Sequence, residues 1–363
     1  MVEKFRVLTA GPNRSATREF HASLEKDGDL ELTALVHSES EILEGVRSLE
    51  PDILLVDLGM SDADEALSTV KSAKAILPDL AVIVVSSVLE TNITMKALAA
   101  GALEYVAKDS EKLHSTTPKE QLDSALRSAK TFVSKARGAE RSRSTRTQRS
   151  HNEADSKPSV SIPKQLEGDF DLILIGISTG GPSALETIFS KLGDRDLPPI
   201  LIVQHMGRLF TNQLAATLAR KSGRTVQEAW RQSELKPNSI YVAPGGFHTE
   251  VRVRTPGEEH HRLRVVEDPP VNGFCPSVDV TWQSVARHFK GKVAAFIMTG
   301  MGDDGAVGLQ HVRESGAVCV AQDEASSVVW GMPGAAVRAG TPHHVLSLDE
   351  IRAAFHKGLG RSK

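Results

Sequence analysis

Cysteine is scarce in this 363-residue chain, which argues against a small secreted fold held together by disulfides. The two cysteines, Cys275 and Cys319, form neither a close pair nor a cluster with histidine at metal-ligand spacing. No apolar run approaches the roughly 18 residues that a membrane span needs, and the first residues contain no signal-peptide core. We therefore expect a protein of a reducing compartment, the cytoplasm, without membrane insertion.

An excess of charge of one sign is also missing. The chain has 43 basic and 46 acidic side chains, a net charge of −3, so it has no global field that would draw it onto nucleic acid. We expect no nucleic-acid partner. Its 40% apolar and 25% charged residues are typical of a globular protein, and its length exceeds the roughly 100–200 residues of one domain. Two domains are the first expectation.

The first part of the chain, residues 1–135, alternates short apolar runs with amphipathic stretches. This pattern is typical of strand-helix units around a parallel sheet. The predicted strands are Arg6–Thr9, Leu30–Val36, Asp52–Val56, Leu80–Ser86 and Glu104–Ala107, and the predicted last helix runs from Lys119 to Ala136. We predict a complete doubly wound α/β domain here.

Residues 136–167 lose this apolar pattern, and arginines from Arg137 to Arg149 are interleaved with Ser, Thr and Gln. A flexible linker is the prediction. Such a tract could instead bind RNA or an acidic surface, but no aromatic residues that would stack on bases accompany it.

Residues 168–363 again alternate apolar runs with helical or loop segments. Its predicted strands are DLILIG, PILIVQH, SIYVAP, VAAFIMTG and AVCVAQ. Nearly continuous apolar runs of this kind are typical of strands buried on both faces of a parallel sheet, although a short buried helix can read the same way. Residues 249–267 instead alternate polar and apolar side chains around a polar turn, which predicts an antiparallel hairpin.

The strongest chemical motif is GISTGG, Gly176 to Gly181, between an apolar strand and a helix-like segment. It contains the G-x-S-x-G pattern, in which glycines permit a sharp turn that presents Ser178 near a helix N-terminus. Free amides there can stabilise an oxyanion. The same turn could instead cradle a phosphate or only cap the helix. A dinucleotide site is disfavoured because the glycine spacing is not G-x-G-x-x-G.

Two further segments could complete a catalytic triad. His205 ends the next predicted strand, at the carboxyl edge where open α/β sheets bind ligands, and could act as the base. Asp303 and Asp304 follow a later strand, in TGMGDDGAVG. One of these carboxylates could orient the histidine while the other caps the following helix.

Six motifs together resemble the chemotaxis protein-glutamate methylesterases of the CheB type, in the order and spacing of that family. They are GISTGG at 176, QHM at 204, IYVAPGGFH at 240, PSVDVTW at 276, TGMGDDGAVG at 299 and GMPGAA at 331. The resemblance implies a Rossmann-like catalytic domain with Ser178 as nucleophile, His205 as base and Asp304 as the acid. It also implies supporting roles for Thr179 and for the backbone amide of Met301 in the oxyanion hole.

The implied reaction is hydrolysis of glutamate γ-methyl esters on the cytoplasmic domains of methylated chemoreceptors, without a metal or other cofactor. Some members of the family also deamidate receptor glutamines, and the residues leave open whether this chain does. Cys275 is a departure, because family members more often carry histidine or arginine before PSVDV. Substrate contacts there are expected to differ.

The first domain resembles a flavodoxin-type response-regulator receiver. Asp57 stands where the phospho-accepting aspartate belongs, and Ser86, Tyr105 and Lys108 match the switch positions. Gly11 and Pro12 replace the acidic pair that holds Mg²⁺ in receivers. Because Mg²⁺ is usually anchored by carboxylates, we predict weak metal binding and little or no phosphorylation. Input from a histidine kinase therefore stays open.

In an ordinary member of the family the receiver covers the active site until it is phosphorylated. A receiver that cannot switch leaves two outcomes: an esterase inhibited until a partner separates the domains, or one that is always active. A non-enzymatic scaffold that keeps the fold is the main alternative function, and a nucleotide-binding enzyme is a distant one because no Walker lysine is present. Nothing in the sequence requires more than a monomer.

Overall fold

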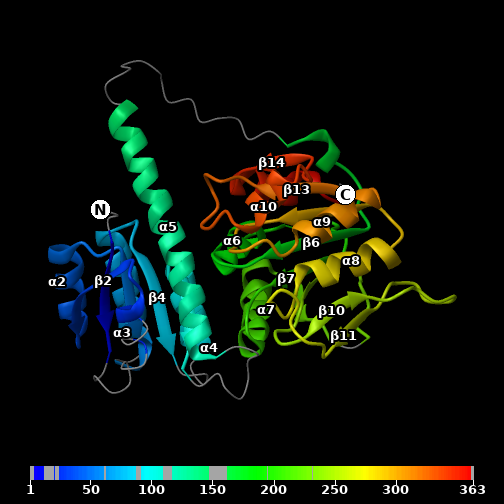
Figure 1. The fold of residues 1–363 in the computed structure, drawn as a ribbon. Coiled ribbons are helices and arrows are strands. Elements are labelled where there is room, and N and C mark those ends of the chain that lie inside the picture. Colours follow the sequence, from blue (N-terminus) through cyan, green and yellow to red (C-terminus); the bar gives the residue numbers. More distant parts are fainter. Residues whose placement is uncertain are drawn as a thin grey trace. The chain divides into compact units, whose positions relative to one another are not determined.

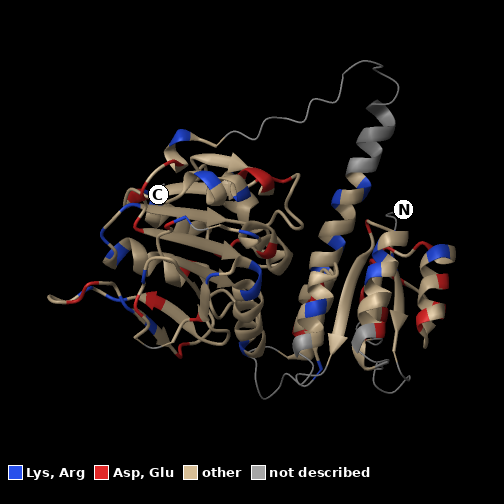
Figure 2. Ribbon diagram, turned by 180° about the vertical axis from the view of Figure 1, so that it is seen from behind, with Lys and Arg blue, Asp and Glu red and all other residues tan. Residues whose placement is uncertain are grey.

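The computed structural model consists of two compact units, one up to Arg146 and one from Ile162 onward (Figure 1). It describes residues 4–11, 20, 24–60, 63–86, 91–108, 117–146, 162–193, 195–230 and 232–360. Each unit has its own parallel sheet, as predicted. Figure 2 shows acidic and basic residues interspersed on the helices of each unit, whereas the strands are mostly uncharged. No described helix is long and apolar enough to cross a membrane.

The first unit contains a five-stranded parallel sheet in the order β2-β1-β3-β4-β5, the flavodoxin-like order. Its strands are β1 (Phe5–Ala10), β2 (Leu30–Val36), β3 (Ile53–Asp57), β4 (Ala81–Ser86) and β5 (Glu104–Ala107). Every residue of β3 and β4 is buried, which explains their continuous apolar runs. All five predicted strands are confirmed to within a residue at each end.

The helices of this unit whose two ends both lie within the described residues are α2 (Glu39–Leu49), α3 (Ala63–Ile76), α4 (Thr91–Ala99) and α5 (Pro118–Arg146), with a 3-10 turn at Leu58–Met60. The predicted end of α5 at Ala136 is wrong, because the helix continues to Arg146. Val133 is the last buried residue described in α5, but good helix formers such as Lys135, Ala136 and Arg137 continue the helix beyond it. Arg137 also donates to both carboxylate oxygens of Asp52, at 2.7 and 2.8 Å.

The predicted linker is therefore helical over its first part. Residues 147–161 lie outside the described residues. At the other end, Lys164–Leu166 forms a 3-10 turn with Leu166 buried, and the Gly168 amide donates to the Gly358 carbonyl at 3.1 Å. The packed second unit thus begins a few residues before the predicted boundary at 168.

The second unit is built on a seven-stranded parallel sheet in the order β14-β13-β12-β6-β7-β9-β8. Its strands are β6 (Leu172–Ile177), β7 (Ile200–Gln204), β8 (Thr225–Glu228), β9 (Ser239–Val242), β12 (Val293–Ile297), β13 (Val318–Gln322) and β14 (His344–Leu346). The five predicted strands are confirmed, and the two edge strands, β8 and β14, were missed. The first strand, β6, lies at the centre, with β7 on one side and β12 on the other.

Helices cover both faces of this sheet. They are α6 (Gly181–Phe189), α7 (Arg208–Ser222), α8 (Val278–His288), α9 (Ala306–Glu314), α10 (Met332–Arg338) and α11 (Leu348–Ala353), followed by a π-helical turn at Ala354–Gly358. Leu172 and Leu174 of β6 join a core with Trp282 of α8 and residues of α9 and α10. Because side chains alternate along a strand, Ile173 and Ile175 face the opposite side, the side of α6, α7 and α11.

The predicted hairpin is confirmed as β10 (His248–Val251) and β11 (Leu263–Val266), an antiparallel pair. It is tied to α8 by two hydrogen bonds. The Thr281 hydroxyl donates to the Thr249 carbonyl at 2.7 Å, and the Val251 amide donates to the Ser284 hydroxyl at 2.9 Å. The hairpin therefore fixes the helix whose N-terminus reaches the carboxyl edge of the sheet.

Candidate active site

The segments predicted to carry the nucleophile and its base end two neighbouring strands. Ile177, the last residue of β6, is paired with Gln204, the last residue of β7. Ser178 and His205 follow directly, and the His205 amide donates to the Ile177 carbonyl at 3.0 Å. The Ser178 amide donates to the carbonyl of Thr299, just beyond β12, at 2.9 Å. Ser178 therefore lies between the ends of β7 and β12, where the strand order reverses.

The Gln204 side chain ties the main chains of Ser178 and His205 together. Its amide nitrogen donates to the Ser178 carbonyl at 2.9 Å and to the His205 carbonyl at 3.2 Å. The Ser178 carbonyl also accepts from the Gly181 amide at 2.8 Å. A Cβ atom at Gly181 would lie 2.0 Å from the Gln204 side-chain oxygen, so the glycine leaves room for this side chain. No role for Gln204 was predicted from the sequence pattern.

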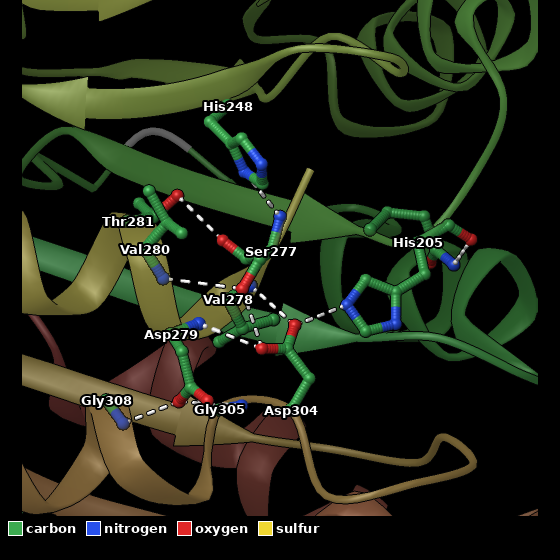
Figure 3. Close-up of polar contacts among 11 residues, drawn as sticks. His205, His248, Ser277, Val278, Asp279, Val280, Thr281, Asp304, Gly305 and Gly308 are labelled. Carbon is green, nitrogen blue, oxygen red and sulfur yellow. Dashed lines mark hydrogen bonds and ion pairs between the residues drawn. The ribbon is translucent and has the colours of Figure 1, made fainter. Parts of the chain in front are cut away.

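The His205 ring is held by a buried carboxylate. Its Nε2 atom lies 2.7 Å from Oδ2 of Asp304, which has no exposed surface (Figure 3). Among the described residues, His205 Nδ1 is buried without a hydrogen-bond partner. With Nε2–H donating to the carboxylate, Nδ1 of the neutral ring carries the free lone pair, so it is the nitrogen that can accept a proton.

Asp304 reaches this position because it accepts hydrogen bonds from the start of α8. The Ser277 hydroxyl donates to Oδ1 at 2.7 Å, the Val278 amide to Oδ2 at 2.7 Å and the Asp279 amide to Oδ1 at 3.2 Å. Burial raises the pKa of Asp304, but the hydrogen bond and charge of His205, with the bonds from Ser277 and Val278, outweigh it and lower that pKa overall. Asp304 is thus a carboxylate at neutral pH.

A second buried carboxylate, Asp279, lies beside Asp304. Its Oδ1 atom accepts from the amides of Gly305 and Gly308, at 2.9 and 2.6 Å, in the first turn of α9 (Figure 3). Burial, followed by the negative charge of Asp304, raises the pKa of Asp279 to about 6, although the Gly308 and Gly305 amides oppose the rise. The prediction that one of the DD pair caps α9 is wrong, because the cap comes from Asp279 and the Asp303 side chain is exposed.

Ser277 is itself fixed by a buried histidine. The Ser277 amide donates to Nδ1 of His248 at 3.2 Å, and His248 Nε2 donates to the Pro269 carbonyl at 3.1 Å. Accepting at one nitrogen and donating at the other defines one neutral tautomer. The Ser277 hydroxyl also accepts from the Val280 amide at 3.4 Å, which makes it the N-cap of α8. Ser277 and His248 were not singled out from the sequence, although serine before a helix is a typical N-cap signal.

Thr179 belongs to the serine turn, and Met301 adjoins the residue that packs against it. Thr179 is buried, and its carbonyl accepts from the Thr299 hydroxyl at 2.9 Å. Met301 follows Gly300, where a Cβ atom would lie 2.7 Å from Ser178 Cβ. The chain before Met301 therefore passes directly against Ser178.

Phe274 is another site residue that the sequence did not reveal. Its ring stacks on the His205 imidazole, with centroids 4.1 Å apart and planes inclined by 14°. The adjoining Cys275 is half-buried, and burial, with the charge of Asp268, raises the pKa of its thiol to about 11. Cys275 is thus a neutral thiol rather than a second nucleophile.

Comparison with known proteins agrees with this arrangement. The model of the CheB methylesterase family matches residues 173–355, and that of the response regulator receiver domain matches residues 8–117. A protein-glutamate methylesterase/protein-glutamine glutaminase of Caulobacter vibrioides is 36% identical over 355 residues, 96% of each chain. One of Desulfotalea psychrophila is 33% identical over 335 residues, 89% of each chain. The chain belongs to the CheB methylesterase family.

A solved structure of a CheB methylesterase catalytic domain, from Thermotoga maritima, is also similar. It is 35% identical, covers 51% of this chain and 97% of its own, and has a TM-score of 0.49.

The receiver unit of this CheB-family chain places Asp57 at the end of β3, where it is 2% exposed. Lys108 Nζ lies 2.6 Å from one Asp57 oxygen and 2.5 Å from the other, and the Gly59 amide donates to Oδ1 at 2.9 Å. The Ser86 hydroxyl is 2.7 Å from the Thr94 hydroxyl in a buried contact. Asp57 and Lys108 therefore meet, whereas Ser86 is engaged with Thr94.

The receiver residues do not fit a Mg²⁺ ion in the part of the chain that the structure describes. Gly11 offers only its carbonyl at the end of β1, and that carbonyl accepts from His37 Nδ1 at 2.8 Å. Pro12 lies outside the described residues. Asp57 is already neutralised by Lys108, and no described cluster of three or more His, Cys, Asp or Glu side chains could hold a metal ion. Mg²⁺ prefers several oxygen ligands, and the described residues around Asp57 supply too few of them.

Proposed function

We propose that the second unit is a serine esterase that hydrolyses glutamate γ-methyl esters on the cytoplasmic domains of methylated chemoreceptors. The observation that carries this function is the 2.7 Å bond from His205 to buried Asp304, beside the strand end that bears Ser178. The names of the Caulobacter vibrioides and Desulfotalea psychrophila relatives support the same substrate class. Such a substrate places the enzyme in the cytoplasm, where it acts as a monomer.

The reaction is an acyl transfer through Ser178. The Ser178 oxygen attacks the ester carbonyl while His205 Nδ1 accepts the hydroxyl proton. Asp304 keeps Nε2 protonated and stabilises the imidazolium. The acyl carbon–methoxy bond then breaks, and His205 returns the proton so that methanol leaves. Water attacks the acyl-enzyme with His205 again as base, which regenerates Ser178 and leaves a glutamate carboxylate.

Two neighbours support this step. We assign Thr179 to the turn that holds Ser178, and the Met301 backbone amide to the oxyanion that forms on the substrate carbonyl. A glutamine side chain differs from the ester only in its leaving group, ammonia instead of methanol. Deamidation therefore needs no further catalytic group, and we include it in the proposed activity.

The receiver unit, in this proposal, works without Mg²⁺-dependent phosphorylation. The Lys108–Asp57 ion pair and the missing acidic residue at Gly11 support this view. Incubation with Mg²⁺ and acetyl phosphate should give no acyl phosphate in a phosphate-affinity gel. An Mg²⁺-dependent band that disappears in Asp57→Asn would restore the phosphorylation switch and a histidine kinase input.

The esterase is tested by methanol release from methylated chemoreceptor signalling fragments. Wild-type chain should release methanol, and Ser178→Ala should fall to the uncatalysed rate. Ser183→Ala, an exposed serine on α6 close to Ser178 in sequence, is the matched control and should retain activity. If the folded wild-type chain and its separate second unit both bind several methylated receptors but release no methanol, a non-enzymatic regulatory role replaces the esterase. Wild-type activity without phosphodonor would also show that the receiver unit does not keep the enzyme inhibited.

A further inference from the structure

The N-termini of α8 and α9 lie against each other, and each receives a carboxylate from the other helix (Figure 3). Asp304, directly before Gly305 and α9, accepts from the first two amides of α8, Val278 and Asp279. Asp279, in the first turn of α8, accepts from the Gly305 and Gly308 amides at the start of α9. The first amides of an α-helix have no partner within the helix, so the two helices satisfy each other.

The two carboxylates of this reciprocal cap also reduce the electrostatic repulsion between the two helix N-termini. Helix N-termini carry partial positive charge, so two of them side by side repel unless anions lie between them. The starts of the helices approach closely only because glycines stand there. A Cβ atom on Gly305 would lie 2.7 Å from Val278 Cγ1, and one on Gly308 would lie 3.0 Å from Asp279 Cα.

We propose that Asp279 is a positioning residue for the esterase reaction, which sets the place of Asp304 and, through it, of His205. This inference rests on the proposed function of Ser178, His205 and Asp304. The Gly305 amide that Asp279 binds belongs to the same rigid peptide plane as the Asp304 carbonyl and Cα. Fixing that plane fixes the point from which the Asp304 side chain extends toward His205.

Asp279 also contacts the Asp304 side chain directly. The Asp279 backbone amide donates to Asp304 Oδ1, so the same residue restrains both the main chain and the carboxylate of Asp304. Without the Asp279 side chain, the Gly305 and Gly308 amides would be buried without an acceptor, and the turn containing Asp304 would move to find one. His205 would then keep its place directly after β7 while Asp304 shifts.

The test compares Asp279→Ala with Asp279→Asn in the full-length chain. Asn keeps an oxygen that can accept from both glycine amides, whereas Ala removes the acceptor. Asp349→Ala, an exposed aspartate in the first turn of α11, is the matched control. The readouts are kcat and KM for methanol release, the rate at which a fluorophosphonate labels Ser178, and the downfield proton NMR signal of the His205–Asp304 hydrogen bond.

We expect Asp279→Ala to lower kcat and the labelling rate about 100-fold, the effect of a misplacement near 1 Å, with KM almost unchanged. Its downfield signal should be lost. Asp279→Asn should stay within about fivefold of wild type, because neutral hydrogen bonds replace charge-assisted ones. Asp349→Ala should match wild type. If Asp279→Ala melts below the assay temperature, Asp279→Ser, whose hydroxyl is too short to span the gap, takes its place.

A folded Ala or Ser variant that labels at the wild-type rate would overturn the role of Asp279. So would an Asn variant as slow as the Ala variant, because the acceptor would then not be what matters. Failure of the proposed function looks different: wild-type chain itself would show no fluorophosphonate labelling that Ser178→Ala removes. The two ideas can therefore fail separately.

Discussion

Asp57 and Asp304 are both buried and both lie at the carboxyl edge of a parallel sheet, yet their surroundings differ. Asp57 contacts the lysine ammonium of Lys108 and one backbone amide. Asp304 accepts from a serine hydroxyl, two helix-start amides and an imidazole. The first carboxylate is neutralised by a cation, and the second is stabilised as an anion next to a ring.

The partner of a buried carboxylate thus decides its chemistry. A lysine ammonium stays protonated at pH values near neutral. A Lys–Asp ion pair therefore keeps both charges and transfers no proton. An imidazole exchanges protons in that range, so a His–Asp pair can serve a reaction in which a proton is taken and returned. Two sheets of the same class thus carry one carboxylate paired with a group suited to proton transfer and one paired with a permanent cation.

The largest expected effect separates these two aspartates directly. Asp304→Asn should lower kcat about 10⁴-fold, because an amide in place of the carboxylate favours the wrong tautomer of the imidazole. Asp57→Asn should leave the esterase rate of the same chain unchanged. Methanol release from methylated receptor fragments measures both. Equal losses in the two variants would contradict the different roles of Asp57 and Asp304 and link the receiver carboxylate to catalysis.

A smaller effect is expected at the strand ends beside the two aspartates. Gln204→Glu removes the donors to the Ser178 and His205 carbonyls and should lower kcat by about 10- to 100-fold, as small misplacements of reacting groups do. Ser86→Ala is the counterpart in the first unit, where the contact that it breaks among the described residues is the one with Thr94. It should leave kcat unchanged. A Gln204→Glu enzyme with wild-type kcat would show that the strand ends need no such tie.

The smallest effect is a change in stability with pH. The folded pKa of Asp279, about 6, lies above its ordinary value of 3.8, so the folded state binds the extra proton. Its stabilising contribution is present below about pH 4 and is lost as the pH rises through 6. Asp279→Asn lacks this titration. The difference between its melting temperature and that of wild type should therefore rise from pH 5 to 7.5, by about 2–4 °C for each kcal/mol of unfolding free energy that wild type loses.

Tryptophan fluorescence measures this change in the second unit alone, because Trp230, Trp282 and Trp330 all belong to it. A difference in melting temperature that stays constant from pH 5 to 7.5 would contradict the raised pKa. Asp349→Ala, whose carboxyl is exposed, serves as the control and should show no such trend.

Strands buried on both faces could be predicted from the sequence because their apolar runs are continuous, as in β4 and β6. The edge strand β8, Thr225–Glu228, was missed because it is short and half polar. The end of α5 was misplaced because the apolar pattern reports burial, whereas good helix formers extend a helix beyond its buried face.

The residues of the candidate site also fall into those that a local sequence pattern marks and those that it does not. The positions of Ser178 and His205 at strand ends follow from local patterns, while their catalytic roles stay predictions. Gln204 and Asp279 act on residues 26 positions away in sequence, and no local signature marks such a contact. An N-cap is usually sought within three residues of its amide, so a cap supplied by another helix is invisible until the chain is folded.

The central position of β6 has a consequence for biosynthesis. This strand leaves the ribosome first among those of its sheet, and its neighbour β12, at Val293–Ile297, follows only after more than half of the unit has been made. Until then β6 presents one row of unpaired amides and carbonyls along an apolar edge, the kind of edge that recruits strands from other chains. Nascent or truncated chains that end before Val293 are therefore the species most in need of a chaperone.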